Sequence, residues 1–280
     1  RMAKQANGSV FIRYGNTSIL VTATMGKEPS EEQDFFPLTV DYVEKMYASG
    51  KIPGGFFKRE AKPTTDATLA ARLIDRSIRP LFPEGFRNPV HVVVNVLSYD
   101  GENEPSEIGV FGASLALMIS DIPFKGPIAG VTVGYIDNQF VINPSQDELN
   151  NLSKLNLAVA GSATSVVMIE SAAKELSEEV MLDAVYAGHE EIKKLCALQN
   201  DFVAEAGKEK IEVVLQSIPE EIMAKVEADY GNRVAEAAML FGKQERQEAF
   251  DATEAEMLER YLSEAENEET YAQNEKWYKA

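Results

Sequence analysis

A nearly all-apolar stretch, Val90-His91-Val92-Val93-Val94-Asn95-Val96-Leu97, decides the fold class of this chain. β-Branched residues favour strands, and a run this short and this apolar predicts a strand covered on both faces. A second run, Gly109 to Ile119, consists of small and apolar residues and predicts a helix packed closely against the same sheet. Together, the predicted strand and helix indicate a domain of mixed α and β structure.

The flanking segments continue this pattern. Gly15-Asn16 predicts a hairpin between β-rich runs at 11–14 and 18–25, and Asp137-Asn138 predicts a turn between strands at 128–135 and 139–142. Two further runs, 155–160 and 165–170, are expected to complete the sheet. The capping residues at 63–66 begin a predicted helix that runs to Pro80.

The pattern becomes helical near Leu176. Ser177 is a good N-cap, and the periodicity continues to about Ala206. Residues 219–280 are typical of amphipathic helices with acidic exposed faces. We therefore expect an α+β domain at 1–205 and a small all-α domain at 206–280, with the boundary near 205–215.

Composition excludes several classes of protein. The 280 residues contain no apolar run of membrane-spanning length, and the first five residues lack the apolar stretch of a signal peptide. Cys196 is the lone cysteine, expected to be a buried apolar residue, so a cytoplasmic location fits best. His91 is expected in the sheet or core, and His189 to be structural or exposed. Two isolated histidines predict no metal site.

The net charge of −18 argues against an RNA-binding protein, but its distribution does not. Residues 51–87, here called the basic island, hold eight basic and four acidic residues. Its first piece is a loop with Phe56, Phe57, Lys58 and Arg59 after two glycines. Exposed aromatic rings beside cations suit single-stranded RNA, because bases stack on the rings while phosphates meet the cations. The alternative is that the two phenylalanines fill the core.

The second piece of the island is the helix with Arg72, Arg76 and Arg79. Their spacing of i, i+4 and i+7 places them on one stripe, and the guanidinium fork suits phosphate groups. Asp75 lies beside the stripe and offers one arginine an ion pair. The alternative for this stripe is a solvated face.

Several motifs along the chain resemble the first RNase PH-like domain of the bacterial polynucleotide phosphorylase (polyribonucleotide nucleotidyltransferase) family. They are Gln33 to Val40 (QDFFPLTV), Gly54 to Glu60 (GGFFKRE), Ala71 to Pro83 (ARLIDRSIRPLFP), Gly112 to Leu117 (GASLAL), Gly126 to Gly130 (GPIAG) and Asn143 to Leu149 (NPSQDEL). The resemblance spans about residues 1–205, and residues 210–280 are similar to the family's helical linker domain in position and character.

The resemblance implies an RNase PH-like β-α sandwich and a homotrimeric ring of chains with two such domains each. It also implies 3′-to-5′ phosphorolysis of single-stranded RNA: inorganic phosphate releases nucleoside diphosphates with the help of Mg²⁺. The loop at Phe56, Phe57, Lys58 and Arg59 would line the pore, and Arg72, Arg76 and Arg79 would face RNA. The resemblance also implies association with other RNA-degradation proteins, and it implies no association with a membrane.

Two departures from the family pattern suggest that this half performs no chemistry. The chain is expected to cover only the first RNase PH-like domain, with the phosphate pocket and the Mg²⁺ ligands in the second. Within this half, glutamates and Pro105 occupy the loop at 101–107 that corresponds to a serine-rich phosphate loop. Lys154 stands where an aspartate would bind Mg²⁺. We therefore expect no catalytic or metal-binding residue here.

Two other interpretations stay open. One is a non-catalytic RNA-binding ring subunit of an exosome-like assembly. The other is a structural interaction module whose basic island is only a solvated face.

Overall fold

The computed structural model describes residues 2–29, 35–56, 58–60, 62–263, 271, 274–275 and 277–278. The chain divides into two compact units, Arg1–Leu215 (unit 1) and Gln216–Ala280 (unit 2). Unit 1 mixes strands and helices, and unit 2 is helical, which confirms the predicted fold class.

The first sheet of unit 1, sheet A, has the strand order β1-β2-β4-β3. Its strands are β1 (Gly8–Tyr14), β2 (Thr17–Met25), β3 (Leu38–Glu44) and β4 (Val90–Ser98). Neighbouring strands are antiparallel except for β3 and β4, which are parallel. The predicted hairpin joins β1 to β2, and Gly15 has the positive φ of 61° that its tight turn needs.

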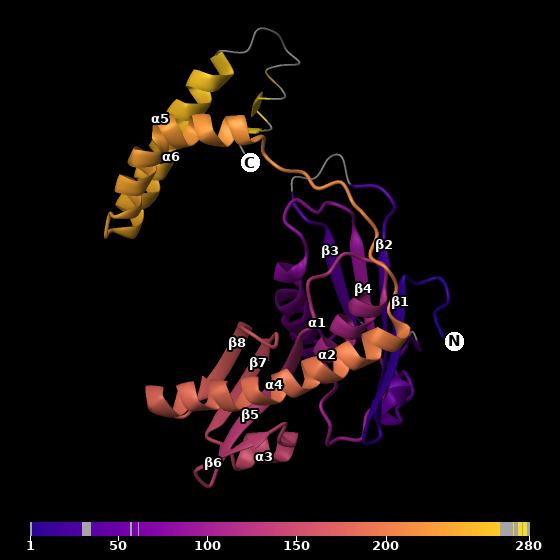
Figure 1. Ribbon diagram of the computed structural model, residues 1–280. Coiled ribbons are helices and arrows are strands. Elements are labelled where there is room, and N and C mark those ends of the chain that lie inside the picture. Colours follow the sequence, from indigo (N-terminus) through magenta and orange to yellow (C-terminus); the bar gives the residue numbers. More distant parts are fainter. Residues whose placement is uncertain are drawn as a thin grey trace. The chain divides into compact units, whose positions relative to one another are not determined.

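Two helices, α1 (Thr65–Ile78) and α2 (Pro105–Ile119), pack on one face of sheet A (Figure 1). Short 3₁₀ helices follow β3 at Met46–Ser49 (η1) and α1 at Arg79–Leu81 (η2). The small residues of α2 permit a close approach, as predicted. A Cβ on Gly112 would lie 2.7 Å from Cγ2 of Val21 on β2, too near without a shift of the helix or the strand.

The prediction that the strand at 90–97 is covered on both faces is wrong. Burial alternates along β4: Val90, Val92, Val94 and Val96 are buried, whereas His91 is exposed. The alternation arises because α1 and α2 cover only the inner face of sheet A.

The later strands form a separate sheet B rather than completing sheet A. Its order is β6-β5-β7-β8, and every neighbouring pair is antiparallel. The strands are β5 (Ala129–Ile136), β6 (Gln139–Ile142), β7 (Leu155–Gly161) and β8 (Val166–Ala173), with the helix α3 (Gln146–Asn151) between β6 and β7. Asp137 and Asn138 have positive φ angles of 49° and 61° at the predicted turn.

Helix α4 (Glu178–Ala206) covers the face of sheet B that α2 does not contact. Ser177 caps it as predicted, and Cys196 is fully buried. One apolar core lies between sheet A and sheet B around α1 and α2, and a second lies between sheet B and α4. The layers of unit 1 are therefore sheet A, helices, sheet B and helix, a β-α sandwich.

Unit 2 contains α5 (Glu220–Ala238) and α6 (Lys243–Ser263). Tyr230 and Tyr261 are buried between them with ring centroids 5.9 Å apart, and the Tyr261 hydroxyl donates to Asp229 at 2.8 Å. Across both units, no helix in the described ranges is long and apolar enough to cross a membrane.

Candidate nucleic-acid interface and an acidic cleft

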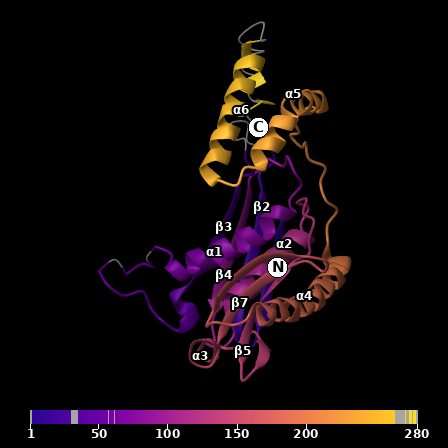
Figure 2. The ribbon, with the colours of Figure 1, turned by 90° about the vertical axis from the view of Figure 1, so that its left-hand side faces the viewer.

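The segment between η1 and α1 carries the first piece of the basic island and projects from unit 1 (Figure 2). Phe56 is 93% exposed, and nothing lies within 4 Å of a Cβ built on Gly54 or Gly55. Phe56 therefore does not fill the core, which rules out that alternative for this residue. Phe57 lies outside the described residues.

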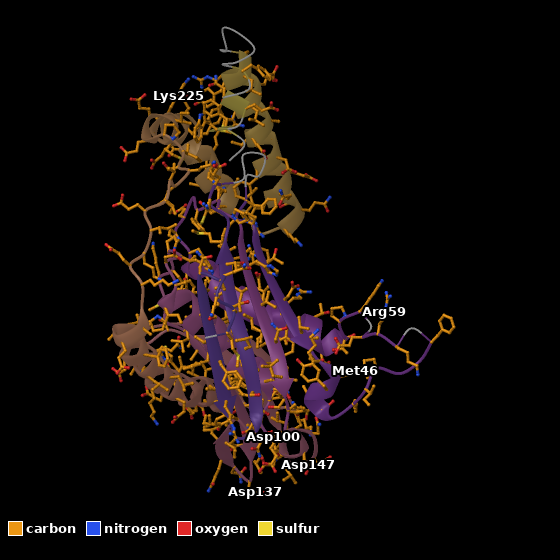
Figure 3. All side chains as sticks on the ribbon, turned by 90° about the vertical axis from the view of Figure 1, so that its right-hand side faces the viewer. Met46, Arg59, Asp100, Asp137, Asp147 and Lys225 are labelled. Atoms are coloured by element: carbon orange, nitrogen blue, oxygen red, sulfur yellow. The ribbon has the colours of Figure 1, made fainter. Side chains whose placement is uncertain are left out.

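The base of this segment is fixed to η1 and β3. The carboxylate of Glu60 accepts hydrogen bonds from the Met46 amide at 3.0 Å and from Lys45 at 3.1 Å, and these bonds lower its pKa. Thr64 donates to Glu44 at 3.1 Å. Lys58 and Arg59 are exposed between these contacts and Phe56 (Figure 3 labels Arg59). The segment thus presents cations and an aromatic ring from an ordered base.

The three arginines of α1 and η2 are all exposed but differ in their contacts. Arg72 forms no salt bridge with any described residue, whereas Arg76 pairs with Glu170 of β8 at 2.8 Å. Arg79 forms the ion pair that its neighbour Asp75 offered, at 2.7 Å.

Arg79 also holds the start of β3. Its guanidinium donates to the carbonyls of Phe36 and Leu38, both at 3.1 Å, and lies 5.7 Å from the centroid of the Phe36 ring. Its donors are therefore engaged within the chain. The stripe divides into the open Arg72, the singly paired Arg76 and a structural Arg79.

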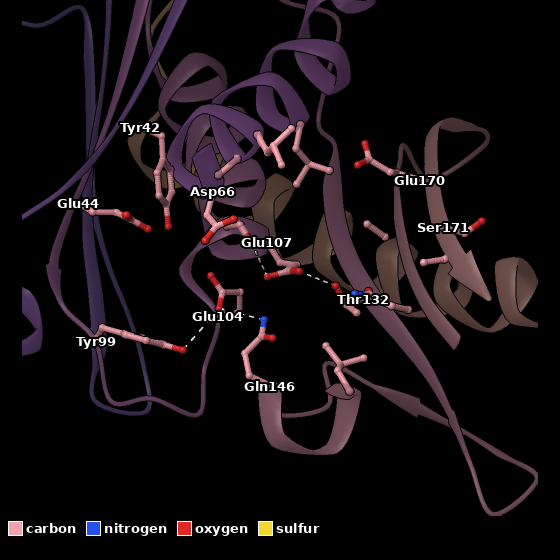
Figure 4. Close-up of a pocket in the computed structure, with 18 residues that line it drawn as sticks. Tyr42, Glu44, Asp66, Tyr99, Glu104, Glu107, Thr132, Gln146, Glu170 and Ser171 are labelled. Atoms are coloured by element: carbon pink, nitrogen blue, oxygen red, sulfur yellow. Dashed lines mark hydrogen bonds between the residues drawn. The ribbon is translucent and has the colours of Figure 1, made fainter. Parts of the chain in front are cut away.

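A second site, here called the acidic cleft, lies between α1, the start of α2 and sheet B (Figure 4). Its volume is about 600 Å³. Its charged lining residues all carry carboxylates, namely Glu44, Asp66, Glu104, Glu107 and Glu170. The cleft is therefore suited to cations and repels phosphate groups.

The glutamates that begin α2 close its N-terminus to an anion. Glu107 accepts from Thr132 at 2.5 Å and from Ser106 at 2.9 Å. Glu104 is the N-cap residue, and burial, reinforced by the charge of Glu107, raises its pKa. Pro105 supplies no amide hydrogen. A helix N-terminus usually attracts anions, but here the helix presents its own carboxylates.

Sequence reasoning found Glu104 and Glu107 but missed the rest of the cleft. Tyr42, Asp66 and Glu170 come from three elements far apart in the chain. No spacing rule links them, since only the packing of α1 between the two sheets brings them together.

The other reactive side chains have structural roles. His91 pairs with Asp41 at 2.8 Å on the outer face of sheet A, and His189 contacts the Ser162 carbonyl at 2.9 Å. Burial raises the pKa of Cys196 to about 11, so its thiol is inert. Within the described ranges, no three histidine, cysteine or acidic side chains converge as metal ligands. The side chains in these ranges therefore do not fit a Mg²⁺ ion.

The layered fold and the order of the motifs agree with comparisons to known proteins. Residues 1–123 match the model of the 3′ exoribonuclease family, domain 1, and residues 126–191 match domain 2 of the same family. The chain belongs to the 3′ exoribonuclease family, a family of enzymes.

Its relatives narrow the class further. The chain is 51% identical over 277 residues to the polyribonucleotide nucleotidyltransferase of Streptococcus gordonii, covering 99% of this chain and 37% of that protein. It is 54% identical over 269 residues to the protein of the same name from Lactococcus lactis subsp. cremoris, covering 96% and 35%. The chain thus spans little more than a third of the length of these relatives.

Proposed function

We propose that this chain is the RNA-holding part of a polyribonucleotide nucleotidyltransferase that degrades single-stranded RNA from its 3′ end by phosphorolysis. The observation that carries the proposal is the exposed ring of Phe56 beside Lys58 and Arg59, on a segment with a fixed base. Base stacking on such a ring contributes about 1–3 kcal/mol per nucleotide. The names and family of the relatives supply the reaction class.

The chemistry of the whole protein is assigned to the part outside this chain. The acidic cleft occupies the N-terminus of α2, where an anion would otherwise bind, and its carboxylates disfavour inorganic phosphate. No described group fits Mg²⁺. On this proposal the chain binds RNA and, as the family resemblance implies, contributes to a cytoplasmic homotrimeric ring, while residues elsewhere in the full-length protein hold phosphate and Mg²⁺ and cut the strand.

RNA affinity of a Phe56→Ala variant of the full-length protein tests the proposal. We expect the Kd for a fluorescent oligoadenylate to rise about tenfold, because one stacking contact is lost. The melting temperature is expected to stay unchanged, since Phe56 is 93% exposed. Phe241→Ala is the matched control, because Phe241 is also fully exposed but lies in unit 2. Equal RNA affinity of the two variants and the wild type would contradict the proposal.

A second experiment distinguishes catalysis from RNA binding alone. The full-length protein is expected to release nucleoside diphosphates from poly(A) only when inorganic phosphate is present. RNA binding without this release would favour the non-catalytic ring subunit, and absence of both would favour the structural module.

A further inference from the structure

The hydroxyl of Tyr42 lies in the acidic cleft without a hydrogen-bond partner among the described residues. Tyr42 is only 4% exposed, so its hydroxyl is also withdrawn from bulk water. Figure 4 shows the hydroxyl directed toward the carboxylates of Glu44, Asp66 and Glu104. A buried polar group without a partner is costly and rare in native proteins, and it indicates that something else satisfies it.

The charge of the cleft is largely uncompensated. Of its five carboxylates, Glu170 alone forms a salt bridge with a described residue, Arg76, at 2.8 Å. Glu44, Asp66, Glu104 and Glu107 have no basic partner among the described residues. Burial and the neighbouring Glu107 raise the pKa of Glu104, so the long hydrogen bonds from Gln146 at 3.3 Å and Tyr99 at 3.5 Å only partly stabilise its charged form in the free cleft. A positively charged ligand would stabilise the charged form of Glu104.

The lining specifies the kind of cation. Its carboxylates and the free lone pairs of Tyr42 are acceptors, so the ligand must be rich in N–H donors, as ammonium groups are. Leucine and alanine side chains form part of the wall and suit methylene groups: Leu69, Ala70, Leu73, Leu149, Ala158 and Ala172. The ring of Tyr99 adds an aromatic surface that attracts cations.

A bare divalent ion fits this cleft less well, because no three of its carboxylates converge as metal ligands. The volume of about 600 Å³ suits a small organic molecule. We propose that the acidic cleft binds a protonated linear aliphatic polyamine, whose ammonium groups donate to Glu104, Glu44 and the Tyr42 hydroxyl while its methylene groups lie against the leucines. The cleft adjoins the RNA-holding segment at Glu44, which lines the cleft and accepts the hydrogen bond from Thr64 at the base of that segment.

Isothermal titration calorimetry of the full-length protein with spermidine tests the proposal. The expected result is one saturable site per chain at constant ionic strength. Glu104→Gln is expected to weaken binding at least about tenfold, because it removes a charge-assisted hydrogen bond. Tyr42→Phe is expected to weaken it about threefold, while its melting temperature stays equal to or above that of the wild type because an unsatisfied hydroxyl is removed.

Controls distinguish the cleft from the general acidity of the chain. Glu254→Gln removes one exposed carboxylate from unit 2 and is expected to leave the affinity unchanged. The proposal is overturned if no saturable binding occurs, or if Glu104→Gln and Glu254→Gln weaken it equally. It is also overturned if Mg²⁺ displaces spermidine no less effectively than a second polyamine does, since the cleft would then recognise charge alone.

Discussion

At the scale of single residues, exposure and partners together separate side chains that are open to a ligand from side chains that hold the fold. Arg72 and Arg79 occupy one stripe, yet Arg79 donates to Asp75 and to two carbonyls that precede and begin β3. Arg72 is exposed and forms no ion pair with a residue that the structure describes. Substitutions of Arg72 and Arg79 are therefore expected to have different effects, although the two side chains are chemically identical.

Arg72→Ala is expected to weaken RNA binding and to reduce the slope of log affinity against log salt by about 0.7, the value for one phosphate contact with a single strand. Its stability should not change, because Arg72 has no salt bridge among the described residues. Arg79→Ala is expected instead to destabilise unit 1 by about 2 kcal/mol, through lost charge-assisted hydrogen bonds. Binding titrations at several salt concentrations and chemical denaturation check both. The same change in RNA affinity and in stability for both variants would contradict the different roles of Arg72 and Arg79.

Asp100 illustrates a carboxylate that stabilises a turn. It accepts hydrogen bonds from the amides of Asn103, Glu102 and Asn16, and from the side chains of Asn103 and Thr17. The bonds from Asn103 are the leading cause of a pKa held far below the usual range. The carboxylate therefore links the β1–β2 hairpin to the loop before α2.

Acid unfolding should reveal how much the Asp100 carboxylate contributes to stability. Since the folded pKa is depressed, the stabilisation is complete above the ordinary aspartate pKa of about 3.9 and is lost as the pH falls below it. Asp100→Asn is expected to lower the free energy of unfolding by about 2 kcal/mol at pH 7 and by much less near pH 2. Denaturation at both pH values measures this difference. A penalty that is the same at pH 7 and pH 2 would rule out the linkage.

At the scale of elements, the sequence predicted what local chemistry determines. The turns at Gly15-Asn16 and Asp137-Asn138 and the Ser177 cap lie where expected, because turn and cap preferences depend on neighbouring residues. Assignment of strands to two sheets was not predicted, since it depends on contacts between distant segments. The acidic cleft was missed for the same reason. The sequence also does not distinguish Arg79, which forms an ion pair, from Arg72, which forms none with a described residue; this difference is visible only in the structure.

The end of α2 depends on a residue far along the chain. Lys210 donates to the carbonyls of Leu117, Met118 and Ser120 at 2.7, 3.0 and 2.7 Å. Burial lowers its pKa to about 8, so the ammonium is largely charged at pH 7. An ammonium at a helix C-terminus is stabilising, because it meets the carbonyls left without partners there.

Lys210→Met is therefore expected to destabilise unit 1 by about 2 kcal/mol at pH 7, because the carbonyls of Leu117, Met118 and Ser120 lose a charged donor. Lys208→Met is the control: Lys208 is exposed and its side chain donates to the Asn7 carbonyl, so a loss below about 1 kcal/mol is expected. Urea denaturation followed by circular dichroism measures both. Similar losses for the two variants would show that the α2 cap is unimportant.

At the scale of the whole molecule, the two units differ in how they are stabilised. Unit 1 has two apolar cores, whereas the described part of unit 2 buries few side chains, among them Tyr230 and Tyr261, and forms surface ion pairs such as Arg233–Glu256 at 2.7 Å. Exposed ion pairs contribute little, typically below about 1 kcal/mol each. Unit 2 should therefore be the less stable unit.

Scanning calorimetry of the chain is expected to show two transitions, with unit 2 unfolding first. Tyr261→Ala removes the centre of the unit 2 core and should shift only the lower transition, by several degrees or more. Ile74→Ala, at a fully buried position of unit 1, should shift only the upper one. A single transition that moves with both substitutions would mean that the units unfold together.

The fixed base of the segment before α1 has a practical consequence. Glu60 and Thr64, at its C-terminal end, form hydrogen bonds with Met46 and Glu44, which precede the segment, while Gly54 and Gly55 face open space. Lengthening such a loop costs only about 0.6 kcal/mol for each doubling of its length. A fluorescent amino acid or a short peptide tag inserted beside Gly54 would therefore leave the folding of unit 1 intact. Placed next to Phe56, such a reporter would detect in real time whether RNA binds where the proposed function places it.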